Sequence, residues 1–189
     1  MRRRLDDLDL KIIHNLQRDG RVSVTALSDR VGSSRPTVTL RLKRLLDEGL
    51  VTIRGGLNIR KLGFKMACVG LEVRNDDTRR EVERVLKRCP RVLSLSRTPE
   101  KANIHVNMWG EDGQTINSTI ESFRDISNVD IVYTHYLETP IHGDITIDVE
   151  PSEGIETPCG RTCSVCYRYN NSWCLGCPVT ADYKNPLLE

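Results

Sequence analysis

Five cysteines near the C-terminus have the residue type and spacing of a metal centre. They are Cys159, Cys163, Cys166, Cys174 and Cys177, and they fall within 19 residues of a 189-residue chain. Two Cys-x-x-Cys pairs among them are separated by seven residues, which can place four thiolates tetrahedrally around zinc. The other two cysteines, Cys68 and Cys89, fall in apolar patterns, and we expect them to be core residues.

The same cysteines also fit an iron–sulfur cluster. Cys159-x3-Cys163-x2-Cys166 is followed by further cysteines, and Cys177 precedes Pro178, as in short loops that wrap a [4Fe-4S] cubane. We give zinc a slight preference, and a metal-free thiol cluster or disulfides is the third interpretation. Four ligands satisfy either centre, so one thiol is expected to be spare and to respond to the redox state.

The charge distribution separates the first 61 residues from the rest. Residues 1–61 hold 14 Lys/Arg and 7 Asp/Glu (net +7), whereas residues 62–189 hold 14 and 19 (net −5). A basic segment on an acidic body indicates that this segment meets a polyanion. No apolar run approaches the roughly 20 residues that span a membrane, and no secretory signal is recognisable. We therefore expect a cytoplasmic protein with no membrane partner.

The basic segment has the periodicity of three short helices, over 6–17, 23–31 and 33–48, each followed by a glycine. An alternating pattern at Leu50 to Ile53 predicts a short strand after them. The third helix should present cations and hydroxyls away from its apolar stripe, and these suit phosphate oxygens and base edges. The candidate DNA-binding residues are Ser34, Arg35, Thr37, Thr39, Arg41 and Arg44. The alternatives are a solvated basic face and a docking surface for an acidic protein.

The middle of the chain predicts the order strand, helix, strand, strand, helix, strand. The strands are expected at 65–73, 92–96, 103–109 and 129–137, with a capping box at Thr78-Arg79-Arg80-Glu81 opening the first helix. This order is the split unit of a ferredoxin-like sheet, so the fold class is α+β. Helices cover only one face of such a sheet. We therefore expect a homodimer that buries the other face.

The motifs together resemble the Lrp/AsnC (feast/famine) transcriptional regulators. The resemblance covers roughly residues 5–140 and is carried by Leu5-Asp6-x-x-Asp9, Ile12-x-x-Leu16-Gln17-x-Asp19-Gly20-Arg21, Leu27-x-x-x-Val31-Gly32-x-Ser34, Val38-x-x-Arg41-Leu42-x-x-Leu45 and Gly49-Leu50-Val51. It implies a helix-turn-helix domain, a β linker and a ferredoxin-like effector domain. It also implies dimers that can assemble into octamers, pseudo-palindromic DNA and amino-acid effectors. The cysteine-rich tail loosely resembles extensions on some archaeal members.

The chain departs from this family where many relatives shape the amino-acid pocket. The turn at 97–103 lacks the family's glycine, and Asn103 stands about where an aspartate is expected. This change argues against amino-acid sensing, although a small-molecule effector stays an open expectation. The candidate effector residues are Thr98, Asn103, His105 and His135, and surface or sheet-packing roles are the alternative for the two histidines.

We accordingly expect a helix-turn-helix domain at 1–50, a β linker at 51–62 and a ferredoxin-like domain at 63–140. A linker or extra strand at 141–157 and a metal-binding tail at 158–189 should follow. The predicted function is that of a sequence-specific transcriptional regulator of double-stranded DNA, with metal- or redox-linked control through the tail, and not of an enzyme. The alternatives are an Lrp-like sirohaem decarboxylase of haem synthesis and an adaptor for a redox partner.

Overall fold

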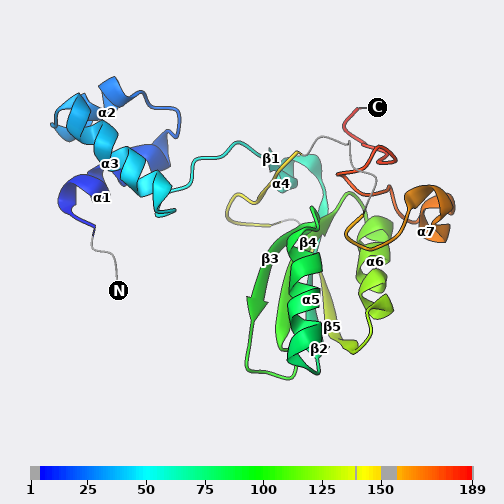
Figure 1. Cartoon of the computed structure of the whole chain (residues 1–189). Coiled ribbons are helices and arrows are strands. Elements are labelled where there is room, and N and C mark those ends of the chain that lie inside the picture. The colour runs from blue at the N-terminus through cyan, green and yellow to red at the C-terminus, as the bar shows by residue number, and fades with distance from the viewer. Residues whose placement is uncertain (1–4, 139, 150–156, 189) are drawn as a thin grey trace. The chain divides into compact units, whose positions relative to one another are not determined.

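Residues 5–138, 140–149 and 157–188 are described in a computed structural model, in which the chain divides into two compact units, 1–55 and 56–189. The first unit contains three helices, α1 (Asp7–Arg18), α2 (Val24–Val31) and α3 (Arg35–Asp47) (Figure 1). An N-cap side chain opens each helix by accepting a backbone N–H of the first turn, as polar caps do. The three caps are Asp6, Ser23 and Ser34.

The core of the first unit is made of the apolar stripes of these helices. Because the stripes recur at helical spacing, all three face one another and exclude water. The buried members are Ile12, Leu16, Leu27, Val31, Val38 and Leu45. The three predicted helices are thus confirmed.

The segment after α3 is not the strand that its alternating pattern predicts. The backbone N–H groups of Leu50 and Val51 both donate to the carbonyl of Leu45, at 2.9 and 3.1 Å. These contacts close the end of α3 and use the donors that a strand would need. The first strand, β1 (Leu57–Asn58), comes later and leads into the one-turn helix α4 (Ile59–Leu62).

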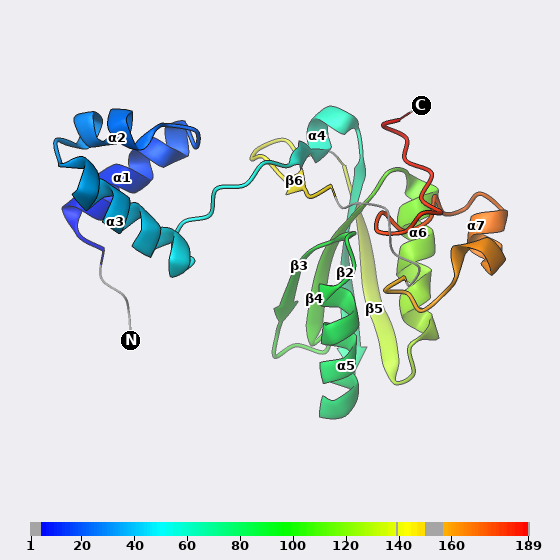
Figure 2. The same cartoon turned by 45° about the horizontal axis from the view of Figure 1, so that its top comes forward.

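The second unit is built on a four-stranded antiparallel sheet in the order β3-β4-β2-β5. Its strands are β2 (Lys65–Val73), β3 (Val92–Arg97), β4 (Ile104–Gly110) and β5 (Val129–Leu137). Figures 1 and 2 show the two longest helices of this unit, α5 and α6, packed on one face of the sheet. This arrangement confirms the α+β fold and its ferredoxin-like unit.

Helix α5 (Asp76–Lys87) begins earlier than predicted. Its N-cap is Asn75, whose side chain accepts the N–H of Thr78 at 2.8 Å, so the predicted capping box at Thr78 to Glu81 is wrong. An asparagine three residues upstream of Thr78 supplies the cap, which places Thr78 inside the first turn. Helix α6 (Gly113–Glu121) follows β4 and continues into a 3-10 turn.

The opposite face of the sheet carries polar and aromatic side chains. The ring of Tyr133 lies over Gly70, where an added Cβ would come within 2.3 Å of the ring. On this face the hydroxyl of Tyr133 bonds His105 Nδ1 at 2.8 Å, and its ring stacks on His135. No described helix covers this face in Figures 1 and 2, and burial of the face in a homodimer remains a prediction.

The remaining segments pack on the second unit. A two-residue strand, β6 (Thr146–Ile147), pairs with β1, within the stretch where a linker or extra strand was expected. Residues 150–156 of that stretch lie outside the described part of the chain. The cysteine-rich tail contains a 3-10 turn (Cys163–Val165) and the one-turn helix α7 (Tyr167–Asn170).

Candidate functional site: an exposed basic helix and a cavity lined by cysteines

One side of α3 is exposed along its length. Ser34 caps this helix, and its Oγ lies 2.8 Å from Thr37 Oγ1, while Thr39 Oγ1 donates to the carbonyl of Arg35 at 2.9 Å. All four residues are exposed, and no ion pair holds the Arg35 guanidinium in the described part of the chain. A hydroxyl that makes one local bond still offers lone pairs, so this surface can contact phosphates and base edges.

Arg41 and Arg44, which were assigned to the same face, instead bind the carboxylates of α1. Arg41 Nη1 lies 2.6 Å from Asp6 Oδ2 and 3.4 Å from Asp9 Oδ1, and Arg44 Nη2 bonds Asp9 Oδ2. Asp9 is buried, and its carboxylate also accepts the N–H of Asp6 in a capping box. The two arginines therefore hold α3 on α1, and their contact with DNA remains a prediction.

Two residues of the exposed side were missed in the sequence. Leu40 is 69% exposed, and Lys43 is exposed one turn further along. Their spacing from Pro36 is i+4 and i+7, which places all three on one helix face. That spacing was the available signal. Leu40 was overlooked because a leucine in a helix normally marks the core.

The candidate effector residues do not converge. Thr98 Oγ1 caps a turn by accepting the N–H of Glu100, and the side-chain amide of Asn103 bonds both the N–H and the carbonyl of Val73. Asn103 therefore ties β2 to the start of β4. His105 and His135 both contact Tyr133 on the open face of the sheet. A pocket role for these four residues remains a prediction.

A small cavity lies between the tail and the rest of the second unit. Its volume is about 60 Å³, and it is lined by all five tail cysteines together with Cys89, which precedes β3. Cys163 and Cys177 are buried, Cys166 and Cys174 are half-buried, and Cys159 is exposed. The spacing of the tail cysteines thus brings them to one place. Among the described residues, however, no three His, Cys, Asp or Glu side chains are grouped closely enough to hold a metal ion.

Burial governs the acidity of these thiols. It raises the pKa of Cys163, Cys174 and Cys89, and it raises the pKa of Cys177 to about 12. A thiol must lose its proton before it can bind zinc or iron, so a metal entering this cavity would displace protons.

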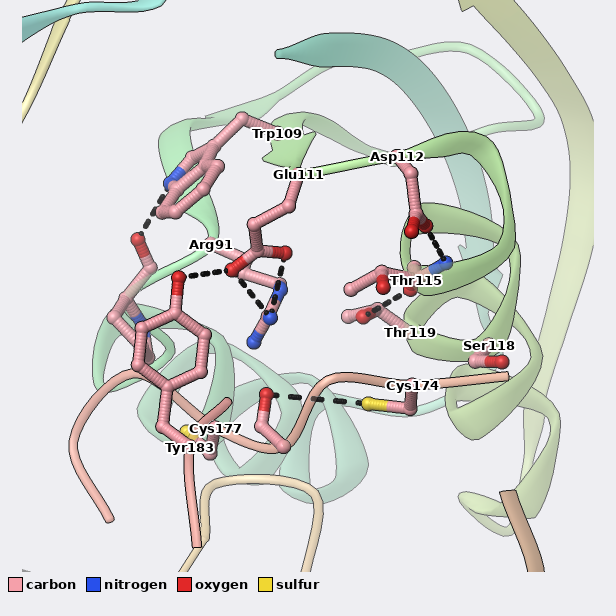
Figure 3. Close-up of polar contacts among 12 residues, drawn as sticks. Arg91, Trp109, Glu111, Asp112, Thr115, Ser118, Thr119, Cys174, Cys177 and Tyr183 are labelled. Carbon is pink, nitrogen blue, oxygen red and sulfur yellow. Dashed lines mark hydrogen bonds and ion pairs between the residues drawn. The ribbon is translucent and has the colours of Figure 1, made fainter. Parts of the chain in front are cut away.

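A buried ion pair underlies the cavity. Arg91 Nη2 lies 2.8 Å from both carboxylate oxygens of Glu111, and the two side chains are only 4% and 2% exposed. Figure 3 shows the hydroxyl of Tyr183, from the tail, on the same carboxylate, at 2.6 Å. Burial, followed by this hydrogen bond, raises the pKa of Tyr183, so that its hydroxyl stays a donor. Arg91 lines the cavity together with the cysteines, and Glu111 accepts the hydroxyl of Tyr183 from the tail. The ion pair therefore lies in contact with both the cavity and the tail.

Further contacts attach the tail to α6 and the turn after it. Ser118 Oγ donates to the carbonyl of Trp173 at 2.6 Å. Arg161 Nη2 and Arg168 Nη1 both bind Asp125 Oδ2, at 2.7 and 3.2 Å. Among the described residues, the tail therefore binds the rest of the second unit at Ser118, at Asp125 and, through Tyr183, at Glu111.

The Asp125 contacts predict an acid-sensitive attachment of the tail. The hydrogen bond from Arg161, followed by that from Arg168, holds the pKa of Asp125 below its usual 3.8, against the opposing effect of burial. When folding lowers the pKa of a carboxyl group, the ionised group stabilises the folded state at pH values above its unfolded-state pKa. This stabilisation is lost as the pH falls from that value through the lowered, folded-state pKa. We expect tryptophan fluorescence of the wild-type protein to report loosening below about pH 4. In Asp125→Asn this acid step should be absent, and an unchanged step would contradict the assignment.

Comparison with known proteins identifies the first unit. Residues 5–46 match the AsnC-type helix-turn-helix domain. A proline dehydrogenase transcriptional activator of Rhizobium radiobacter is 49% identical over 76 residues, which are 40% of this chain and 48% of that protein. The HTH-type transcriptional regulator FL11 of Pyrococcus furiosus is 27% identical over 135 residues, 71% of this chain and 89% of that protein.

Solved structures show the same two-unit fold. The transcriptional regulator NMB0573 of Neisseria meningitidis, in complex with L-Met, superposes with a TM-score of 0.66 at 22% identity, over 77% of this chain and 97% of that one. All three of these proteins are named as transcriptional regulators. None of the described helices is long and apolar enough to cross a membrane.

Proposed function

We propose that this chain is a sequence-specific DNA-binding regulator of the Lrp/AsnC type. The match of residues 5–46 to the AsnC-type helix-turn-helix domain and the fold shared with a solved transcriptional regulator support this proposal. The observation that carries the proposal is the exposed side of α3, where Arg35, Thr39 and Lys43 meet no acidic neighbour in the described contacts. In a homodimer, two such helices can enter successive major grooves of a pseudo-palindromic site. The protein would then act in the cytoplasm on double-stranded DNA.

Replacing Arg35 tests this assignment. Arg35→Ala is expected to weaken binding to the selected DNA site by about 1–3 kcal/mol if the guanidinium reads a base, with the free energy of unfolding unchanged. Fluorescence anisotropy over a range of salt concentrations measures both the affinity and the salt slope. Arg80→Ala is the matched control, because Arg80 is an exposed arginine near the start of α5, outside the helix-turn-helix domain. Wild-type affinity and slope in Arg35→Ala would refute the assigned DNA face.

We further propose that the tail cysteines hold a metal centre that controls DNA binding. The support is the convergence of five cysteines on one small cavity. In addition, Asn103 of the candidate effector turn is engaged in backbone contacts. Oxidation of a spare thiol, or loss of the metal, would then change how the tail is held on the second unit. Zinc keeps its slight preference over a [4Fe-4S] cluster.

Metal analysis with a visible absorption spectrum tests the centre directly. Protein purified without oxygen should contain one centre per chain. A colourless protein with one zinc would identify a tetrahedral thiolate site. Broad absorption near about 400 nm with stoichiometric iron would identify a cluster. Protein that contains neither metal, and takes up neither on reconstitution, would refute the tail centre and leave the DNA-binding proposal standing.

A small-molecule effector has a second candidate place. A cavity of about 240 Å³ lies between α5 and α6 and is closed by residues 158–160 of the tail. Its walls are mostly apolar, including Val82, Leu86 and Phe123. Because L-Met is bound by the solved relative NMB0573, binding of methionine by this chain is a direct comparison to make by calorimetry.

A further inference from the structure

Leu40 is the most exposed large apolar residue in the described part of the first unit. It is 69% exposed on α3, and Leu10 follows at 53% on α1. A single exposed leucine is common on protein surfaces, so the surroundings of each leucine must show whether it meets a partner. The two leucines share a domain and a residue type, and their neighbours differ.

Leu40 lies in the middle of the exposed face of α3. On a helix surface the neighbours of a residue are those three and four positions away, which here are Pro36, Thr37, Lys43 and Arg44. Two of these neighbours are cationic, one carries a hydroxyl, and the exposed Pro36 adds a second apolar surface. The partner of this face must therefore attract cations and also present an apolar group between them.

Leu10 has the opposite surroundings. Asp6 and Asp7 are exposed one turn before it, at the start of α1, and no Lys or Arg stands three or four positions from it on either side. Carboxylates repel a phosphate backbone, so this place is not expected to touch DNA. Leu10 is thus a matched comparison for Leu40, because it differs in the charge around it and not in residue type.

The major groove of B-DNA supplies the chemistry that the face around Leu40 requires. Its base edges present hydrogen-bond donors and acceptors, and thymine alone adds an apolar group, the 5-methyl. Phosphates border the groove and attract the cations that border Leu40. An acidic protein would also attract these cations, but the match of residues 5–46 to a helix-turn-helix domain favours DNA.

We propose that Leu40 contacts a thymine 5-methyl group in the major groove and so determines one base pair of each half-site. This inference rests on the proposed DNA-binding function. The exposed cations, Arg35 and Lys43, hold the helix to the DNA, whereas Leu40 discriminates between bases. Because Leu40 carries no charge, its contact adds sequence preference without adding to the salt dependence of binding.

Uracil is the probe, since it differs from thymine only by the missing 5-methyl group. Each thymine of the selected duplex is replaced in turn by uracil, and the affinity of the full-length protein is measured by fluorescence anisotropy. For the wild type, one replacement in each half-site should weaken binding by about fourfold, the effect of losing one buried methyl-sized group. This series needs no protein variant.

Leu40→Ala completes a cycle between the side chain and the methyl group. The variant should bind the thymine duplex at least about fourfold more weakly, with an unchanged salt slope, and the sensitive replacement by uracil should no longer affect it. Alanine is a strong helix former, so the variant should keep its helix. Leu10→Ala is the control and should match the wild type on both duplexes.

The outcomes separate this inference from the proposed function. A uracil effect as large in Leu40→Ala as in the wild type, or a selected site in which no thymine methyl matters, would overturn the inference and leave DNA binding standing. A smaller oligomer of Leu40→Ala in sedimentation, with thymine and uracil discriminated as in the wild type, would assign Leu40 to a contact between copies and also overturn it. A wild-type protein that selects no DNA sequence would overturn both.

Discussion

Glu111→Gln should lower the free energy of unfolding of the second unit by about 3–5 kcal/mol, the typical cost of removing one partner of a buried ion pair. The substitution keeps the shape of the side chain but removes the charge opposite Arg91, whose side chain is 4% exposed. Arg91 also lies 5.7 Å from the ring centroid of Trp109 and 5.9 Å from that of Tyr183, so several neighbours fix its position.

Urea unfolding followed by circular dichroism measures this effect. Glu121→Gln is the matched control, because the Glu121 side chain is 41% exposed and pairs with Arg124 at the helix surface. Ion pairs at the surface contribute little to stability, so the free energy of unfolding of the control variant should change by less than about 1 kcal/mol. A loss below about 1 kcal/mol in Glu111→Gln would mean that Arg91 finds water or another acceptor, and it would contradict the assigned role of the buried Arg91–Glu111 pair.

The second large effect is expected in the helix-turn-helix domain, where Arg41 and Arg44 enclose Asp9. The double variant Arg41→Ala with Arg44→Ala leaves a carboxylate that is 1% exposed without a cation. We expect a loss of about 3–5 kcal/mol in the free energy of unfolding. Arg41→Ala alone should lower stability and DNA affinity together, whereas Arg35→Ala should lower affinity only.

Adding Asp9→Asn to the double variant provides the control. The triple variant no longer buries an uncompensated charge, so a large part of the lost stability should return. Such a return would show that the cations act on Asp9, as a coupled set does in a mutant cycle. If the double variant unfolds like the wild type and loses only DNA affinity, then both arginines face DNA in solution and the contacts with α1 are weak.

The sequence predicted the elements well because their signals are local. Apolar periodicity located α1, α2 and α3, and the strand limits at Lys65–Val73 and Val129–Leu137 agree with the structure. The predictions were wrong where a second local interaction, absent from the pattern used, determined the structure. Leu50 to Ile53 alternate like a strand but close the end of α3, and Thr78 resembles a cap but follows the true cap, Asn75.

The sites were predictable only in part, because side-chain partners are separated in sequence. The face of α3 could be read from helical spacing, but nothing in the sequence showed that Arg44 would bind Asp9, 35 residues away. The cysteine spacing indicated a tail centre. It did not indicate that Cys89 would line the same cavity, since Cys89 also fits the apolar face of a helix.

The central claim is that this chain binds a specific DNA sequence and that the metal state of the tail changes this binding. The most direct test measures the affinity for a duplex selected from random sequences, using metal-loaded, metal-stripped and oxidised protein at one salt concentration. We expect a pseudo-palindromic site, and affinities that differ by about 5- to 150-fold between metal-loaded protein and the other two states, the usual range for coupled sites. Equal affinities in all three states would contradict metal control, and failure to select any sequence would contradict the proposed function as a whole.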